Sequence, residues 1–239
     1  MKLPTLTAIA NGLNLKSHAS AGHCWVCLVP LTFSLVSCLA GCAIVGPPSI
    51  QPREANVVSL DPQDWYIFYS SNMPYHPSAD PSGAWSFEFP RAESGGHVNY
   101  VQTPFNATVP IHDISISFKI ESDTPQYKVI DPTDIPPATV HLFLEQKNDD
   151  LSDPNGRWWA TWSQYDLGSQ DNTTVTFVIP LTPDQWSNVE GQRDSTSFYA
   201  ALGNIGWVGV TFGGQYFFGH GVALFDGSAK FVLVDINVN

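Results

Sequence analysis

The nine residues DISISFKIE, from Asp113 to Glu121, decide the fold class of this chain. Apolar and polar side chains alternate strictly, with Ile114, Ile116, Phe118 and Ile120 on one side and Ser115, Ser117 and Lys119 on the other. A period of two places alternate side chains on opposite faces of an extended chain, and a helix does not produce it. The segment is therefore predicted to be a β-strand with one face in a hydrophobic core.

The same alternation recurs along the rest of the chain. It appears in ATVHLFLEQK (138–147), NTTVTFVIPL (172–181), GWVGVTFGG (206–214) and AKFVLVDINV (229–238). In the last of these segments, Val232, Val234, Ile236 and Val238 are predicted to face away from Asp235 and Asn237. Clusters of turn-forming residues, such as SDPNG and FDGSA, separate the segments.

Helical segments are few. TPDQWSNV (182–189) favours a short turn, with Thr182 or Asp184 as its cap, and STSFYAALGN (195–204) favours a short helix that ends at Gly203. Strands without βαβ alternation predict an all-β fold, a two-sheet antiparallel β-sandwich (jelly roll) with one or two short helices.

The C-terminal part resembles jelly-roll domains of the galactose-binding-like type. The resemblance lies in PLTPDQWSNVEG (180–191) and in the run from FYAALGN through WVGVTFGG and GHGV to VLVDINV (198–238), about a fifth of the chain. Many carbohydrate-binding modules of secreted bacterial enzymes belong to this type. The resemblance implies a closing strand that lies next to the first strand, and a carbohydrate ligand.

The first 41 residues are of a different kind. Lys2 and Lys16 are their only charged residues, and an apolar stretch from Cys24 to Ala40 is interrupted by Pro30. A basic start, an apolar middle and small residues at the end are typical of a secretory signal peptide, which we expect at 1–41. The alternative is a retained transmembrane anchor, for which the stretch is short and carries a proline.

The sequence LAGC, from Leu39 to Cys42, resembles the lipobox of bacterial lipoproteins. The resemblance implies cleavage before Cys42, lipid attachment to this cysteine and anchoring in the cell envelope, in the outer membrane if the host is a diderm bacterium, because Ala43 rather than an aspartate follows. Residues 42–61 contain three prolines and no aromatic residue, as expected for a flexible linker, and the jelly-roll domain is predicted at 62–239.

Charge and cysteine content exclude other classes of protein. The chain has 22 acidic and 10 basic residues, a formal net charge of -12, which argues against nucleic acid as a partner. Cys24 and Cys27 form a CxxC pair, but no second pair follows, so neither a zinc site nor a redox site is expected. After cleavage, Cys42 would be the only remaining cysteine.

Aromatic residues are the main candidates for a ligand site. In RWWATWSQYDL (157–167), alternation separates Trp159 from Trp158 and Trp162. Trp158 and Trp162 bracket the small Ala160, a pattern that favours the core, so Trp159 is predicted to be exposed to ligand. The alternative is that most of the eight tryptophans only fill the core.

Four further residues are predicted at the same site. His141 and Glu145 lie on the polar side of their strand, where they could bond ligand hydroxyl groups or only face solvent. Tyr216 and His220 lie in the glycine-rich segment GGQYFFGHG. His220 is flanked by glycines, so backbone freedom could be what matters there.

Evidence for catalysis is weak. Glu88, Glu145 and Asp166 are available as carboxylates, but their spacing does not indicate the pair that a glycosidase needs. No GxSxG, HExxH, P-loop or EF-hand sequence occurs. Enzymatic activity stays open but is not favoured. No cofactor is expected, apart from a structural calcium ion that Glu88 and Asp235 could share.

The sequence thus predicts a lipid-anchored, extracytoplasmic carbohydrate-binding protein without catalytic activity. The alternative is a structural or assembly lipoprotein of the envelope that binds another protein through an exposed aromatic surface. A glycan site would be a hollow row of aromatic rings flanked by polar side chains, whereas a docking site would be flatter and more apolar.

Overall fold

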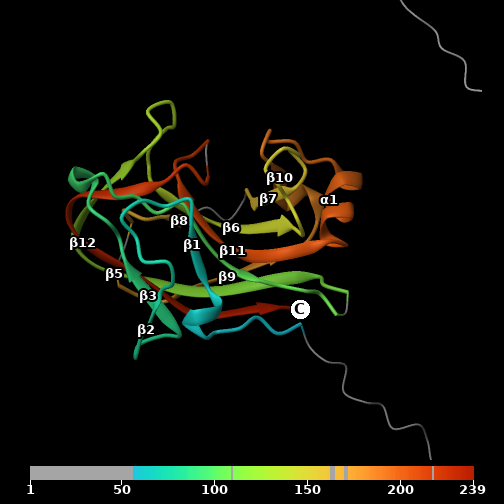
Figure 1. Ribbon diagram of the computed structural model, residues 1–239, viewed down its shortest axis with the longest axis horizontal. Coiled ribbons are helices and arrows are strands. Elements are labelled where there is room, and N and C mark those ends of the chain that lie inside the picture. Colours follow the sequence, from blue (N-terminus) through green and yellow to red (C-terminus); the bar gives the residue numbers. More distant parts are fainter. Residues whose placement is uncertain (1–55, 109, 162–164, 170–171, 217) are drawn as a thin grey trace, which may run out of the picture. The chain divides into compact units, whose positions relative to one another are not determined.

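A computed structural model describes residues 56–239 except 109, 162–164, 170–171 and 217. The predicted signal peptide, Cys42 and most of the predicted linker lie outside the described residues. Figure 1 shows the described part as two layers of β-sheet, with a short helix at one end. Among the described residues, no helix is long and apolar enough to cross a membrane.

The first sheet has seven strands in the order β1-β4-β11-β6-β7-β10, with β8 paired to β6. Its members are β1 (Tyr66–Phe68), β4 (Tyr100–Pro104), β6 (Thr139–Gln146), β7 (Arg157–Ala160), β8 (Tyr165–Asp166), β10 (Trp186–Asn188) and β11 (Ile205–Gly213). All their pairings are antiparallel.

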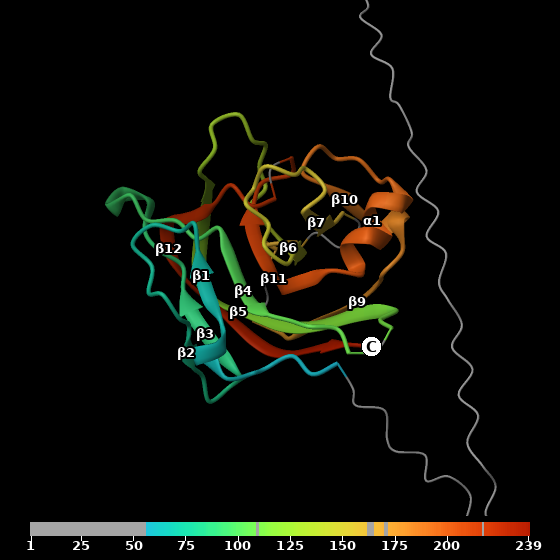
Figure 2. The same cartoon turned by 45° about the vertical axis from the view of Figure 1, so that its right-hand side comes forward.

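The second sheet has five strands in the order β2-β3-β12-β5-β9, also antiparallel. Its members are β2 (Ser78–Ala79), β3 (Trp85–Glu88), β5 (Asp113–Val129), β9 (Val175–Pro180) and β12 (Val222–Val238). The long strands β5 and β12 pair along most of their length and run beneath the first sheet in Figure 2. The predicted all-β, two-sheet antiparallel sandwich is confirmed.

Helices are short and lie in the connections. They are α1 (Ser195–Leu202) and the 3-10 turns η1 (Pro62–Asp64), η2 (Ala92–Ser94) and η3 (Pro183–Gln185). Asp194 caps α1, because its side chain accepts a hydrogen bond from the Ser197 amide at 2.7 Å, and Gly203 follows the last turn as predicted. The segment predicted as a turn at 182–189 forms η3 and continues into β10.

Large aromatic side chains fill the space between the sheets. Four tryptophans are fully buried there: Trp65, Trp85, Trp158 and Trp186. Three of their indole groups donate hydrogen bonds to backbone oxygens at 2.7–2.9 Å. Most of the described tryptophans therefore stabilise the core, the alternative that the sequence had left open.

The N-terminal end of the described chain packs on the last strand. Asn56 forms a bridge with Val238, and its side-chain oxygen accepts a hydrogen bond from the Thr108 amide at 2.9 Å. Val58 is buried in the core. Residues 56–61, which the sequence assigned to the linker, are thus part of the packed structure.

Candidate functional site

The candidate site lies on the face of the seven-stranded sheet that points away from the core. The strand register places one row of side chains across five strands of this face: Gln102, Gly209, Phe143, Trp159 and Ser187. A neighbouring row contains Tyr100, Thr211 and His141. Antiparallel pairing thus gathers residues from distant parts of the sequence into one aromatic and polar surface.

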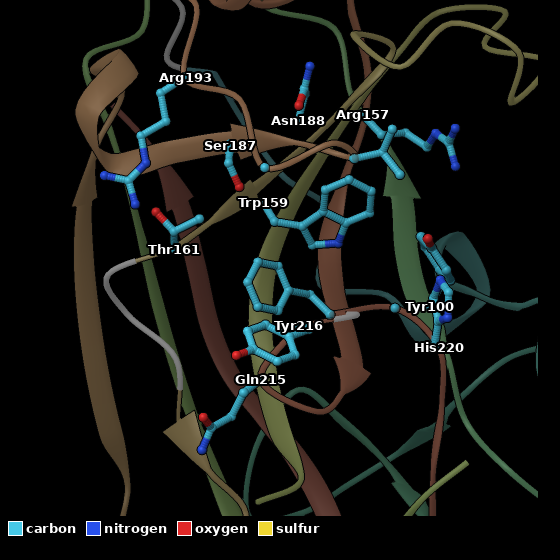
Figure 3. Close-up of a pocket in the computed structure, with 14 residues that line it drawn as sticks. Tyr100, Arg157, Trp159, Thr161, Ser187, Asn188, Arg193, Gln215, Tyr216 and His220 are labelled. Carbon is cyan, nitrogen blue, oxygen red and sulfur yellow. The ribbon is translucent and has the colours of Figure 1, made fainter. Parts of the chain in front are cut away.

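A pocket of about 370 Å³ opens over one half of this face. Trp159 and Tyr100 contribute its floor, Ser187 and the segment up to Arg193 one wall, and the loop from Gln215 to His220 the opposite rim. In Figure 3, Trp159 lies at the centre, with Ser187, Thr161 and Arg193 on one side and Tyr100, Arg157 and His220 on the other. This volume falls in the range of about 300–1,000 Å³ that is usual for small-molecule sites.

Trp159 lies on the predicted face, but the prediction that it is exposed is wrong. Its side chain is only 4% exposed, since the rings of Phe143 and Tyr100 pack with it in a small aromatic cluster. The indole Nε1 donates a hydrogen bond to Thr211 Oγ1 at 3.1 Å. Trp159 can therefore offer a ligand only the part of its ring that faces the pocket.

Trp158 faces the core, as predicted. It is 1% exposed, and its ring packs edge-on against Phe198 of α1 with a centroid distance of 5.1 Å. Ala160, two residues on, is also in the core. Trp162, predicted on the same side, lies outside the described residues.

His141 is buried beneath the loop that follows β11, rather than at a solvated or ligand-bonding surface. Its Nδ1 donates to the Ala160 carbonyl oxygen at 2.9 Å, which leaves Nε2 as the acceptor facing Thr139 Oγ1 at 3.1 Å. Phe218 stacks on the imidazole with a centroid distance of 3.9 Å. Burial lowers the pKa of His141 to about 4, so the ring is neutral. His141 supports the loop and does not line the pocket.

Glu145 is also buried, at 8% exposure, and does not line this pocket. Gln102 Nε2 donates a hydrogen bond to it at 3.3 Å, and Arg157 lies opposite it on β7. Burial raises the pKa of Glu145 to about 7, although the Gln102 hydrogen bond acts in the opposite direction. The predicted polar row on β6 is therefore covered, because rings from β1, β4 and β7 and the loop after β11 lie over it.

Tyr216 and His220, two of the predicted ligand-binding residues, line the pocket together with Trp159. Both are exposed, and both lie in the loop between β11 and β12. A buried carboxylate fixes this loop, because Asp134 accepts hydrogen bonds from the Gly214 amide at 2.6 Å and the Tyr216 amide at 3.0 Å. His220 Nδ1 lies 2.9 Å from Asp131 Oδ2.

Glycine allows this loop to lie directly on the floor of the pocket. A Cβ atom at Gly219 would come within 2.7 Å of the Tyr100 hydroxyl oxygen. Gly221 has a φ of +101°, a conformation that side chains other than hydrogen rarely permit. The backbone freedom that the sequence suggested around His220 is therefore used by its two neighbours, Gly219 and Gly221.

The opposite wall is built by a side-chain-stabilised turn after β10. Asn188 Oδ1 accepts hydrogen bonds from the backbone amides of Glu190 at 3.0 Å and Gln192 at 2.9 Å. Its Nδ2 donates to Asn155 Oδ1 at 2.9 Å. These bonds hold the segment that carries Arg193 beside Ser187.

Of the residues that line the pocket, the sequence had predicted Trp159, Tyr216 and His220. Those that it missed include Tyr100, Ser187, Arg193, Gln215 and Phe218. Gln215 and Phe218 lie in the glycine-rich segment that the sequence had singled out. Ser187 and Arg193 gave no local signal, because their position depends on the pairing of β10 with β7.

The two carboxylates considered for calcium lie on neighbouring strands but not opposite each other. Glu88 pairs with Lys230, whereas Asp235 pairs with Ser117. Within the part of the chain that the structure describes, no group of three or more His, Cys, Asp or Glu side chains is arranged to hold a metal ion.

Neither the comparison with protein-family models nor that with curated proteins returned a match to this chain. The functional assignment therefore rests on the fold and on the pocket.

Proposed function

We propose that this protein is a lipid-anchored, extracytoplasmic carbohydrate-binding protein and that the pocket over Trp159 binds part of a glycan. The lipid anchor at Cys42 rests on the LAGC sequence, and the glycan on the composition of the pocket. One observation carries the proposal: aromatic rings and polar side chains converge in a hollow on one face of the sheet. Sugars present both flat C–H faces and hydroxyl groups, and such a surface matches both.

Several polar groups of the pocket are available to a ligand. Within the described residues, no hydrogen bond is found for the Ser187 hydroxyl, the Gln215 side-chain amide or the Tyr216 hydroxyl. The other polar groups are already used: Thr161 Oγ1 donates to the Gln185 carbonyl oxygen at 3.3 Å, and Asn188 stabilises its own turn. Donors and acceptors without internal partners favour a ligand rich in hydroxyl groups.

Glycan-array binding by the purified protein tests this proposal, with Tyr216→Ala as the diagnostic variant. Tyr216 is 66% exposed, so its truncation should leave the fold intact while weakening glycan binding by about tenfold, as expected for loss of one stacked ring. Tyr199→Ala is the matched control, because Tyr199 is 54% exposed on α1 and does not line the pocket. Absence of binding to every glycan, or equal binding by the two variants, would reject the proposed site.

A second candidate function is docking of another envelope protein, and one observation favours it. Tyr66 and Phe68 of β1, Tyr75 and Trp207 form an aromatic cluster with centroid distances of 5.3–5.9 Å. Tyr75 is 58% exposed, and β1 is an edge strand of its sheet. Edge strands with exposed rings are suited to contact a partner protein.

Photo-crosslinking from position 75 in intact cells distinguishes the two functions. A discrete protein adduct that forms at position 75 and not at position 199 would favour docking. Glycan binding that is lost in Tyr216→Ala, without such an adduct, would favour the carbohydrate-binding function.

A further inference from the structure

The aromatic surface of the seven-stranded sheet continues beyond the pocket, toward β1. Trp159 and Tyr100, which line the pocket, belong to one cluster of buried rings. Phe68, the last residue of β1, packs against this cluster, and the next residue, Tyr69, places its ring against Tyr100. The ring centroids of Tyr69 and Tyr100 are 5.4 Å apart, and the two planes meet at 74°. Because Tyr69 does not line the pocket, its ring forms a separate surface beside it.

The ring of Tyr69 is accessible, unlike the ring that separates it from the pocket. Tyr69 is 56% exposed, close to the 66% of Tyr216, whereas Tyr100 is 9% exposed. Partial burial raises the pKa of the Tyr69 hydroxyl group, the charge of Glu145 raises it further, and the charge of Arg157 lowers it. Arg157 and Tyr100 both line the pocket, and they lie on the same side of it in Figure 3. Tyr69 is therefore placed just outside the border that these two residues form.

An unusual backbone conformation holds Tyr69 in this position. Its φ is +52°, in the left-handed region that bulky residues rarely adopt. The two residues that follow are fixed to the segment before β4. The Ser71 amide donates to the His97 carbonyl oxygen at 2.9 Å, and Ser70 Oγ accepts a hydrogen bond from the Asn99 amide at 2.9 Å. Strained conformations of this kind are concentrated at functional sites. A ring that is already fixed also loses little conformational freedom when a ligand stacks on it.

We propose that the pocket and Tyr69 are adjoining subsites for one oligosaccharide, with one sugar unit over Trp159 and a later unit of the same chain stacked on Tyr69. The inference rests on the proposed glycan-binding function and specifies the ligand as a chain of several sugar units. A single sugar in the pocket leaves the ring of Tyr69 uncovered, because this ring lies beyond the pocket lining. A chain that leaves the pocket over Tyr100 meets Tyr69 next, because the two rings are in contact.

Calorimetry with oligosaccharides of different length tests this inference. The probes are disaccharides and hexasaccharides of the cello-, manno-, xylo- and galacturono-series, titrated into the purified full chain. In at least one series, the hexasaccharide should bind about tenfold more tightly than the disaccharide, as expected for one additional stacked ring. Equal affinities for the disaccharide and the hexasaccharide in every series that binds would contradict the inference.

Tyr69→Asn is the decisive variant, and Tyr199→Asn is its control. A longer chain also offers more positions in which it can bind, and only a variant at Tyr69 separates this effect from a second subsite. Asparagine tolerates the left-handed backbone at residue 69 better than most residues do. Tyr199 is 54% exposed on α1 and does not line the pocket, so its variant also removes an exposed ring.

The variants should differ in their response to chain length. Tyr69→Asn should weaken hexasaccharide binding about tenfold and leave disaccharide binding unchanged, whereas Tyr199→Asn should change neither. Tyr69→Phe keeps the ring and should bind the hexasaccharide as tightly as the parent protein does. Since both tyrosines are largely exposed, all three variants should keep the melting temperature of the parent protein.

The possible failures are distinguishable. If Tyr216→Ala weakens binding but Tyr69→Asn binds the hexasaccharide as tightly as the parent protein, the second subsite is wrong and glycan binding in the pocket stands. If Tyr69→Asn weakens disaccharide and hexasaccharide binding equally, Tyr69 belongs to the pocket and the second subsite is likewise wrong. If no oligosaccharide of the panel and no glycan of the array binds, both proposals fail.

Discussion

Replacing Glu145 by glutamine should make the protein more stable at high pH and leave it nearly unchanged at low pH. The pKa of this carboxyl group is about 7 in the fold, against an ordinary value of 4.5, because burial disfavours its charged form. Its contribution to stability is therefore complete below pH 4.5 and is lost as the pH rises through 7. At about 1.36 kcal/mol per pKa unit, the loss amounts to about 3 kcal/mol.

The glutamine side chain keeps the shape and can still bond to Gln102, but it carries no charge. The difference in free energy of unfolding between Glu145→Gln and the parent protein should thus rise from near zero at pH 4 to about 3 kcal/mol at pH 8, in favour of the variant. His141 acts in the opposite sense, since its pKa of about 4 makes stability increase between pH 4 and 6.5. Its contribution is common to both proteins and cancels in the difference.

Urea titrations of the two proteins at intervals from pH 4 to pH 8 measure this difference. Glu93→Gln, at an exposed carboxyl group in η2, controls for the removal of one negative charge. A difference between Glu145→Gln and the parent that stays constant with pH would refute the reasoning, because it would mean that the Glu145 carboxylate is hydrated in the folded protein.

Three other predictions follow from packing and from the N-terminal sequence. Trp158→Ala should lower the free energy of unfolding by about 3–5 kcal/mol, and Trp159→Ala by at least about 2 kcal/mol, because both indole rings are buried. An unchanged midpoint of urea unfolding for either variant would contradict the burial of that ring. Gly209→Ala should lower the free energy of unfolding by about 2 kcal/mol or more, because the new Cβ would clash with the Val101 carbonyl oxygen. Gly203→Ala, whose Cβ would have its nearest contact at 3.5 Å, should leave the melting temperature nearly unchanged. Cys42→Ala should leave the protein unprocessed or released from the membrane, and a mature membrane-bound product on fractionation would exclude lipid attachment at this cysteine.

Much of the fold could be predicted because its signals are local. Alternation in DISISFKIE identifies β5, and the glycine after AAL marks the end of α1. The last strand shows where such reasoning fails. A bulge between Leu233 and Asp235 shifts the register, so Phe231 and Leu233 face the core with Ile236 and Val238, and not Val232 and Val234 as alternation had predicted.

The candidate site was less predictable, because it depends on contacts between distant segments. Alternation placed His141 and Glu145 correctly on the side of β6 opposite Leu142, but it could not reveal that Phe218 and the rings of neighbouring strands cover that side. Likewise, nothing in the sequence near Arg193 indicates that β10 pairs with β7 and brings this residue beside Trp159. Burial of a strand face is decided by what packs on it.

The position of β12 in the five-stranded sheet also determines when this protein can fold. The strand lies between β3 and β5, so the middle of that sheet is formed by a strand that follows the other four in the sequence. Until β12 has been synthesised, β3 and β5 each lack the strand that lies between them, and their unpaired edges and apolar faces stay open to other chains. The five-stranded sheet therefore cannot assemble until β12 has been synthesised, and a nascent chain that stops short of β12 should aggregate rather than mature. Long-range pairing of this kind, such as Ile114 with Val238, also predicts slow folding in vitro.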